Sequence, residues 1–388
     1  MSPPATSTPL PINQAGFDAA IVGGGIMGCT VALRLADAGM RVVVIDRGGI
    51  GGAASGVNAG TLSLQIKRLS LIPYAIRAAE LWAQMSARLD MDVKFRRSGG
   101  LNLAFTSAEA ERLVSDMTAR REAGLPITFL DAAAARAREP GLSEHVEMAS
   151  FCPLDGYSNP SLTSRALRKA LAARGVAVFE HCGVLSVADG DGGYQLLLEN
   201  RETVQARRLV LAAGAWTRTL SLGLGVDLPV GARVNQMMVT ERAPPMVNGV
   251  IGHISGLMSI KQAENGTLII GGGWQGSGAP GEPGQPVIEN LADNLRFATL
   301  AMPALALLRV VRTWYGYDGF VPDFLPLVGA LPWLREAYVI ACVRGGYTIG
   351  PYMGDLLAAR ILGEEPELPL FDPARVAVRV NAPAAVVA

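Results

Sequence analysis

A glycine-rich turn near the N-terminus constrains the fold of this chain more than any other stretch. An apolar run over residues 17–22 leads into Gly23-Gly24-Gly25-Ile26-Met27-Gly28. A helical segment follows as far as Gly39, and a second apolar run over residues 42–45 ends at Asp46. This order predicts a strand, a tight turn, a helix and a second strand, with an acidic residue about 20 positions after the turn.

The residue types in this turn are those that a bound dinucleotide requires. Gly23 allows the tight turn, Gly25 lets the backbone approach a pyrophosphate, and Gly28 lets the helix pack closely on the strand. Unpaired N–H groups at the helix N-terminus attract the negative charge, and Asp46 accepts hydrogen bonds from the ribose hydroxyls of an adenosine. We therefore expect FAD or NAD(P) here rather than the alternative, a glycine-rich surface turn.

The composition restricts the class of protein. With 388 residues, the chain is long enough for two domains or for one domain with a large insertion. Lysine plus arginine and aspartate plus glutamate both number 34, and this balance argues against nucleic acid or an anionic membrane surface as the main partner. Hydrophobic residues make up 50% and charged residues 18%, which suggests that part of the surface is buried against another subunit.

The cysteines and histidines argue against a metal site. The four cysteines stand at positions 29, 152, 182 and 342 without a C-x-x-C pair, and there are three histidines. We expect buried, reduced thiols in a cytoplasmic protein and no bound metal. The first 14 residues lack the charged and apolar regions of a signal peptide, so we expect a disordered leader there.

Hydrophobic periodicity and turn residues predict the remaining elements. Helices are expected over residues 69–89, 107–123, 131–138, 161–173, 290–301 and 352–362, with Ser107 and Asp131 as candidate N-caps. Strands are expected over residues 101–105, 176–179, 233–240, 257–261, 267–271 and 337–342, a hairpin over 184–198, and an apolar strand from residue 208 into a glycine turn at 214. The strands after residue 226 indicate an antiparallel sheet inserted into a nucleotide-binding fold.

Four features in this order resemble the FAD-dependent D-amino-acid oxidase superfamily, which includes glycine oxidase and sarcosine oxidase. They are the turn at residues 23–28, the small residues 54–60, the stretch Leu211-Ala212-Ala213-Gly214-Ala215-Trp216, and Pro322-Asp323 with Pro326 and Gly329 shortly before a glycine loop at 345–351. The resemblance covers residues 17–363. It implies an α/β fold in which a Rossmann-type FAD-binding domain, of the glutathione-reductase type, is interrupted by an antiparallel-sheet substrate domain.

The resemblance also implies domain limits. The FAD-binding domain would comprise residues 17–94, 151–225 and 313–375, and the substrate domain residues 95–150 and 226–312. A leader over residues 1–16 and a tail over residues 376–388 would flank them.

The expected cofactor contacts come from several parts of the chain. The loop at residues 47–60 is either a second cofactor cradle, which its position directly after Asp46 favours, or a flexible linker. A helix beginning at Tyr352 would stabilise negative charge on the reduced flavin ring. The cofactor-binding residues would be Gly23, Gly25, Ile26, Met27, Gly28, Asp46, Arg47, Ala54, Ser55, Asn58, Gly60, Val184, Ala213, Gly214, Trp216, Gly345, Gly346, Tyr347, Thr348, Ile349 and Gly350.

Within the superfamily, Asn235-Gln236 and residues 257–262 and 269–274 are most similar to the catalytic subunits of heteromeric enzymes: opine oxidase, D-hydroxyproline or proline dehydrogenase, and hydrogen cyanide synthase. This similarity implies an amino acid or opine as substrate, and further subunits that carry other redox cofactors and offer a link to a membrane. The implied reaction is oxidation of a C–N bond, with hydride transfer to flavin N5 and hydrolysis of the imine. An NAD-dependent dehydrogenase and a non-catalytic FAD-binding subunit are the alternatives.

One departure from the superfamily concerns the substrate site. Many members carry W-x-G-x-R-P, whose arginine binds the substrate carboxylate, whereas Trp314-Tyr315-Gly316-Tyr317-Asp318-Gly319 places an acid at that position. Because like charges repel, Asp318 would pair with a cationic arm or with the amine of the substrate, or it is a turn acid. Carboxylate binding would pass to Arg344, unless that residue is an ordinary surface arginine.

Other candidate catalytic residues keep a structural alternative. Lys261 lies in an otherwise apolar strand and either acts beside the reduced flavin or oxygen, or reaches the surface. His253 either lines the substrate site or is a hydrogen-bonded structural residue. Tyr315 and Tyr317 either wall the pocket or belong to the core. The chain shows no Ser/His/Asp or paired-carboxylate arrangement, as expected where a cofactor carries the chemistry.

Overall fold

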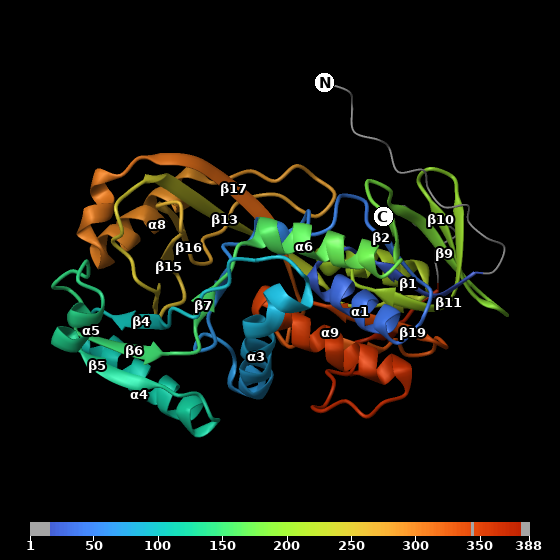
Figure 1. The fold of residues 1–388 in the computed structure, drawn as a ribbon, viewed down its shortest axis with the longest axis horizontal. Coiled ribbons are helices and arrows are strands. Elements are labelled where there is room, and N and C mark those ends of the chain that lie inside the picture. The colour runs from blue at the N-terminus through green and yellow to red at the C-terminus, as the bar shows by residue number, and fades with distance from the viewer. Residues whose placement is uncertain (1–15, 343–344, 382–388) are drawn as a thin grey trace.

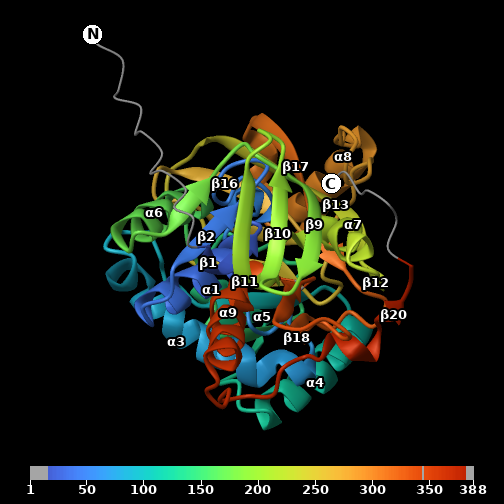
Figure 2. The ribbon, with the colours of Figure 1, turned by 90° about the vertical axis from the view of Figure 1, so that its right-hand side faces the viewer.

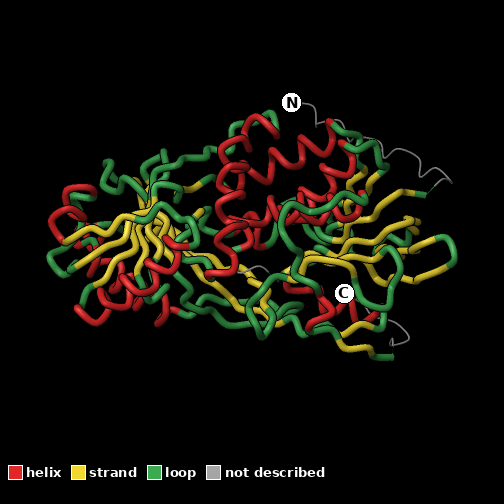
Figure 3. The backbone as a smooth tube through the Cα atoms, turned by 90° about the horizontal axis from the view of Figure 1, so that it is seen from below, coloured by secondary structure: helices red, strands yellow, loops and turns green. Residues whose placement is uncertain are grey.

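Two eight-stranded sheets dominate the protein, and they lie toward opposite ends of the molecule (Figure 1). The computed structural model describes residues 16–342 and 345–381. The expected leader over residues 1–14 and the candidate Arg344 lie outside the described residues. Viewed from below, the helices gather mainly beside the first sheet, while the strands of the second form a separate group (Figure 3).

The first sheet has the order β18-β19-β11-β1-β2-β8, with β10 and β9 as an antiparallel extension from β11 (Figure 2). Alternate residues of β1 enter different cores: Ala19 and Ile21 pack in one buried cluster, Ala20 and Val22 in another. Burial on both faces explains why this strand is a continuous apolar run. The strands are β1 (Phe17–Val22), β2 (Val42–Ile45), β8 (Ala177–Phe179), β9 (Val184–Gly190), β10 (Gly193–Leu198), β11 (Thr203–Leu211), β18 (Leu327–Ala330) and β19 (Ala337–Ala341).

The second sheet has the order β17-β13-β16-β15-β14-β4-β6-β5 and is antiparallel except for the parallel pair β14–β4. β17 pairs with β13 from Val310 to Phe320, so a domain limit placed at residue 313 would fall inside a paired strand. The strands are β4 (Gly100–Ala104), β5 (Thr128–Asp131), β6 (Met148–Cys152), β13 (Gly231–Arg242), β14 (Val250–His253), β15 (Ser259–Gln262), β16 (Thr267–Gly271) and β17 (Val310–Phe320). Two short pairs, β3 (Thr61–Leu62) with β7 (Gly156–Tyr157) and β12 (Val226–Asp227) with β20 (Val378–Arg379), complete the strands of the described residues.

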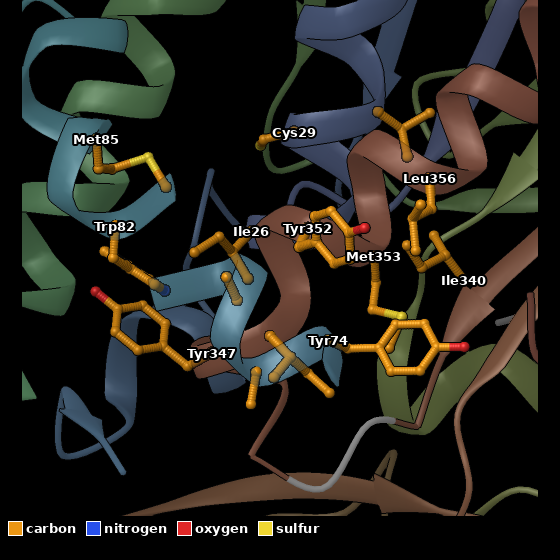
Figure 4. Close-up of a cluster of buried hydrophobic side chains, with 14 of the residues drawn as sticks. Ile26, Cys29, Tyr74, Trp82, Met85, Ile340, Tyr347, Tyr352, Met353 and Leu356 are labelled. Carbon is orange, nitrogen blue, oxygen red and sulfur yellow. The ribbon is translucent and has the colours of Figure 1, made fainter. Parts of the chain in front are cut away.

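The helices flank the sheets and pack on one another beside the first sheet. Trp82 of α3 lies against Tyr347 of α9, with ring centroids 5.0 Å apart (Figure 4). The indole N–H of Trp82 donates to Thr348 O at 2.8 Å, so the start of α9 is fixed from the side. The helices are α1 (Ile26–Asp37), α2 (Ala54–Val57), α3 (Ile72–Arg88), α4 (Ser107–Glu122), α5 (Ala132–Arg138), α6 (Pro160–Ala173), α7 (Thr217–Gly223), α8 (Ile288–Ala301) and α9 (Gly346–Leu362).

Most expected elements are confirmed. Asp131 caps α5 by accepting from Ala134 N–H, but Thr106, not Ser107, caps α4. Strands β5, β6, β14, β17 and β18 and helix α7 were not expected. The prediction that the last helix begins at Tyr352 is wrong, because α9 begins at Gly346 and Pro351 lies inside it. Pro351 is the sixth residue of α9, so it removes the helical N–H that would pair with Tyr347 O, and buried packing on both sides of it holds the helix.

Two general expectations concern the whole chain. All four cysteines are buried and free, as predicted. Within residues 16–342 and 345–381, no helix has both the length and the apolar character needed to cross a membrane.

Candidate functional site

Segments that the sequence analysis singled out meet at one edge of the first sheet. β1, β2, β11 and β19 run parallel, so their carboxyl ends lie together. Gly23 N–H donates to Ile45 O at 2.8 Å, and Ala212 N–H donates to Val22 O at 2.8 Å, which ties three strand ends to one another. In open α/β sheets, ligands bind in the crevice outside this edge.

The first turn accepts only glycine at two positions. Gly23 has a φ of +118°, and a Cβ atom there would lie 2.3 Å from Ala212 O. A Cβ atom at Gly28 would lie 2.1 Å from Gly23 O, so α1 starts directly against the strand end. At Gly25 an added Cβ atom would lie 3.2 Å from Ser55 Oγ, so the loop after Asp46 closes directly on this glycine.

Asp46 links this turn to the loop that follows β2. Its Oδ2 accepts from Gly24 N–H at 2.6 Å, and its Oδ1 accepts from Gly48 N–H at 2.8 Å. Burial raises the pKa of Asp46, and these two hydrogen bonds oppose that rise. The neighbouring Arg47 stacks over the ring of Trp216, with its guanidinium carbon 3.9 Å from the ring centroid.

The small-residue loop after Asp46 is held by specific hydrogen bonds. Ser55 Oγ accepts from Ile26 N–H at 2.9 Å, and the amide of Asn58 donates to Ala54 O and Ser55 O. Asn58 Oδ1 in turn accepts from Gly60 N–H at 2.6 Å. The loop therefore lies against the first turn in a defined conformation, which favours the cradle over a flexible linker.

The segment after β11 contributes Ala213, Gly214 and Trp216 to the same edge. Gly214 adopts a φ of +55°, and Trp216 N–H donates to Ala213 O at 3.0 Å. Among the described residues, Trp216 Nε1 is a buried donor without a hydrogen-bond partner. Val184 differs from these three residues, because its side chain is packed in the core cluster that includes Ile45.

Because α9 begins at Gly346, residues 346–350 form its first turns instead of a loop before it. Gly345, with a φ of +68°, is now the N-cap, and the free N–H groups belong to the turn after it. The Tyr347 hydroxyl hydrogen-bonds with Ser158 Oγ and Thr163 Oγ1, both at 2.8 Å. Ile349 is buried, and a Cβ atom at Gly350 would lie 2.9 Å from Met27 Cγ, so these residues pack α9 on α1.

Lys261 is a buried lysine of β15 whose side chain lies against the end of the loop at residues 47–60. Its side chain is 2% exposed, and its Nζ donates to Ser158 O at 3.4 Å and lies 4.9 Å from the ring centroid of Tyr157. A Cβ atom at Gly60 would lie 2.7 Å from Lys261 Nζ. Burial lowers the pKa of Lys261 to about 7. The lysine therefore does not reach the surface, and it can give up or take a proton near neutrality.

His253 lies on the other face of the second sheet. In β14, Gly252 pairs with Ser259, so the side chains of His253 and Lys261 point to opposite faces. The imidazole packs between Phe105 and Phe297, with Nε2 3.2 Å from a Glu109 carboxylate oxygen. Burial lowers the pKa of His253, and Glu109 opposes this. The geometry fits the structural alternative and does not bring His253 to the carboxyl ends of β1, β2 and β11.

Asp318 lies in β17, opposite Arg233 of β13. Asn235 Nδ2 donates to Asp318 Oδ2 at 3.3 Å, and Asn235 Oδ1 accepts from Gln275 Nε2 at 2.7 Å. Because Asp318 sits within a long paired strand, it is not a turn acid. Tyr317 donates its hydroxyl proton to Glu282 O at 2.7 Å, on the face of β17 opposite Asp318.

Three buried polar residues were not predicted from the sequence to lie near this site. Lys67 is 4% exposed, and its Nζ donates to Gly345 O at 3.3 Å, beside the start of α9. Asp155 is fully buried and accepts from Ser63 Oγ at 2.7 Å, from Leu64 N–H at 2.7 Å and from an amide N–H at 2.9 Å. Asn102 of β4 is buried with its Oδ1 unpaired among the described residues. No spacing or motif marks these positions, because each matters only through segments that are distant in sequence.

Comparisons with known proteins agree along most of the chain. A sequence model of the family described as FAD dependent oxidoreductase matches residues 18–360. One of the subunits of opine oxidase from Rhizobium meliloti is 27% identical, over 84% of this chain and 89% of its own. The HcnC subunit of hydrogen cyanide synthase from Pseudomonas protegens is 26% identical, over 91% of this chain and 94% of its own. The crystal structure of glycine oxidase from Geobacillus kaustophilus superposes with a TM-score of 0.82 at 27% identity, covering 91% of this chain and 96% of that one.

Proposed function

We propose a substrate class and a subunit role for this chain, which belongs to the family of FAD dependent oxidoreductases. The protein is an FAD-dependent enzyme that acts on C–N bonds of amino acids, as glycine oxidase does. The finer proposal is that it oxidises an amino acid or an N-substituted, opine-like amino acid as the catalytic subunit of a heteromeric dehydrogenase or oxidase.

The residues at the edge of the first sheet fit FAD. Gly25 is half-buried directly before α1, where a pyrophosphate would meet the helix N-terminus, and Asp46 stands at the tip of the next strand. The unpaired Trp216 Nε1 gives the site a buried donor that has no acceptor among the described residues. We propose that the residues from the first sheet and from α9 hold the cofactor, and that the second sheet forms the substrate side, with the domain limit after β17 rather than at residue 313.

The observation that carries the proposed substrate side is the contact between Lys261 and Gly60. It brings a buried amine from the second sheet against the loop that follows Asp46, where the two sheets meet. When bound, FAD accepts the hydride that leaves the substrate carbon beside the nitrogen. The resulting imine takes up water and yields a 2-oxo acid or aldehyde plus an amine. With its pKa near 7, Lys261 is able to take the proton that the substrate amine must lose before it reacts.

Asp318 supports a substrate that carries a positive charge. The Asn235 amide donates a hydrogen bond to one oxygen of this carboxylate. The pairing of β17 with β13 fixes the position of Asp318 along the strand. A guanidinium or ammonium arm would pair with this carboxylate, whereas a second carboxylate would be repelled. Arg344, proposed for the substrate carboxylate, lies outside the described residues, so its role stays a proposal from the sequence.

The subunit role rests on composition and on relatives. The chain is half hydrophobic and has zero net charge, which suits a surface covered by another polypeptide. Two similar proteins are named as subunits, of opine oxidase and of hydrogen cyanide synthase. We propose that this chain likewise works with further subunits that carry redox cofactors.

The test is anaerobic titration of the purified protein, together with any co-purifying subunits, while the absorbance of the flavin is followed. Octopine, nopaline, D-hydroxyproline, proline, sarcosine and glycine are the candidate reductants. At least one should bleach the flavin completely, with one equivalent of 2-oxo acid or aldehyde formed for each flavin reduced. If none bleaches the flavin in the full complex, the chain is a non-catalytic FAD-binding subunit and the proposal is wrong.

A variant of Asp318 tests the cationic-arm proposal. Asp318→Ala should weaken apparent binding of octopine, which has a guanidinium, about tenfold or more, but should change binding of sarcosine little. The matched control is Asp293→Ala, which removes an exposed acid on α8. Equal losses for octopine and sarcosine in Asp318→Ala would show that the carboxylate has no selective role.

A further inference from the structure

Two arginines from distant segments meet at one aromatic ring. Arg68 and Arg233, here called the arginine pair, lie over the ring of Phe324, with their guanidinium carbons 5.1 and 5.0 Å from the ring centroid. We propose, on the basis of the proposed function above, that the arginine pair binds a second carboxylate of the substrate, carried on the substituent of its nitrogen. The preferred substrates are then N-carboxyalkyl amino acids.

Aromatic contacts hold the arginine pair in place. The rings of Phe320 and Phe324 stack with their centroids 5.7 Å apart and an interplanar angle of 16°. The guanidinium carbon of Arg233 also lies 4.9 Å from the centroid of Phe320, so it contacts both rings. A guanidinium that is already positioned by stacking loses less side-chain freedom when it binds an anion.

No acid among the described residues neutralises the arginine pair. Within residues 16–342 and 345–381, neither guanidinium forms an ion pair. Asp323, directly before Phe324, is bound by Arg375 at 2.8 Å, and the Asp318 carboxylate accepts from the Asn235 amide. Two like charges held close together repel each other, and an anion that binds both of them relieves this repulsion.

The spacing and exposure of the arginine pair suit a carboxylate. Both guanidinium carbons lie about 5 Å from the same centroid, so they are at most about 10 Å apart. Arg68 is exposed, whereas Arg233, Phe320 and Phe324 are half-buried, so a ligand can reach the charges from solvent. The forked guanidinium matches the two oxygens of a carboxylate, with hydrogen bonds of about 2.8 Å.

The position of Arg233 links the arginine pair to the candidate substrate side. Arg233 of β13 stands opposite Asp318 of β17, and its guanidinium lies over Phe320, two residues or about 7 Å further along β17. Between these positions, a Cβ atom at Gly319 would lie 3.1 Å from Ala215 N, in the segment after β11. A substrate whose cationic arm pairs with Asp318 can therefore place a carboxylate at the arginine pair.

The position of Arg68 links the same site to α9. Lys67, the residue before it, donates from Nζ to Gly345 O at 3.3 Å, at the N-cap of α9. Arg68 thus brings its charge to Phe324 from the segment that runs past the start of this helix. The arginine pair gives the second carboxylate, which Asp318 would repel, a separate place to bind.

The experiment uses the full chain with FAD and any co-purifying subunits, and it compares compounds that differ by one carboxylate: iminodiacetate with sarcosine, and octopine with N-ethylarginine. The rate of anaerobic flavin bleaching is measured at equal, subsaturating concentrations. The ratio of rates within each pair of compounds is then compared between proteins, so that differences in intrinsic reactivity cancel.

The double variant with Arg68→Gln and Arg233→Gln should lower this ratio about tenfold or more, because the charge-assisted hydrogen bonds to one carboxylate are lost. Arg68→Gln alone, at the exposed arginine, leaves the packed part of the site intact and should lower the ratio about threefold. The matched control Arg242→Gln, at an exposed arginine at the end of β13, should keep the ratio.

A purely structural role gives a different result, because it would lower the rates of both members of a pair alike. Such equal losses, a ratio that stays unchanged in Arg68→Gln or in the double variant, or bleaching by sarcosine without any bleaching by iminodiacetate and octopine would overturn the inference while leaving the amine oxidation intact. Failure of every compound, including those of the wider titration, would instead refute the proposed function and this inference with it.

Discussion

Replacement of Lys261 by methionine removes the one charge that the second sheet buries against the cofactor loop. The two side chains have similar length and volume, so the packing against Tyr157 and Gly60 is retained. What changes is the titration. Burial lowers the pKa of Lys261 from 10.5 to about 7 in the folded protein, whereas the methionine does not titrate.

The sign of the effect follows from proton binding. Between pH 7 and pH 10.5 the unfolded chain keeps the proton on Lys261 and the folded chain has lost it, so the free energy of unfolding rises with pH. The slope approaches about 1.4 kcal/mol per pH unit once the folded lysine is neutral. Since the lysine is half protonated at its folded pKa, the gain from pH 7 to pH 9 is about 2 kcal/mol.

Urea unfolding at pH 7 and pH 9 measures this gain. The protein is freed of FAD, so that a change in cofactor affinity does not enter. The rise in unfolding free energy should be about 2 kcal/mol larger for the unmodified chain than for Lys261→Met, because the other titrating groups cancel in the comparison. Lys169→Met, which removes an exposed lysine of α6, should behave like the unmodified chain. If Lys261→Met and the unmodified chain show the same pH dependence, the lysine keeps an ordinary pKa and the proposed proton acceptance fails.

Two further changes test the cofactor turn and the buried carboxylate. Gly23→Ala places a Cβ atom 2.3 Å from Ala212 O at a φ of +118°, so the purified protein should lose most of its bound flavin, as read from the ratio of flavin to protein absorbance; full retention would contradict the close approach. Asp155→Leu leaves three donors unpaired and should lower the free energy of unfolding by about 3 kcal/mol or more in urea, whereas a change below about 1 kcal/mol would show that water replaces the carboxylate.

The backbone at the carboxyl ends of β1, β2 and β11 could be predicted from local patterns because each part of it is formed by consecutive residues. The turn at residues 23–28 is set by steric limits on neighbouring backbone atoms, and the strands beside it are continuous apolar runs because both faces are covered. The start of α9 was misplaced for a related reason. Pro351 looks like a helix start in the sequence, but Trp82 and Tyr347, which fix the earlier start, come from packing between α3 and α9.

The arrangement of the second sheet and of its side chains could be predicted from the sequence to a much smaller extent, because it depends on tertiary structure. β17 was not expected as a strand, and only its pairing with β13 shows that Asp318 lies in a sheet and not in a turn. The opposite directions of Lys261 and His253 follow from the alternation of side chains across paired strands, which a single stretch of sequence does not reveal.

The dinucleotide turn, the acid after it and the family of flavoenzymes to which the chain belongs can therefore be read from consecutive residues, because these features are local backbone requirements. The set of polar side chains that lie next to the loop at residues 47–60 depends on the tertiary structure. Lys261 and Asn102 are far apart in sequence, and the pairing of β15, β14 and β4 brings them to one face, where Thr61 of β3 meets Ser259 of β15. The burial that lowers the pKa of Lys261 and leaves Asn102 without a partner among the described residues is a property of that assembly and of no single segment.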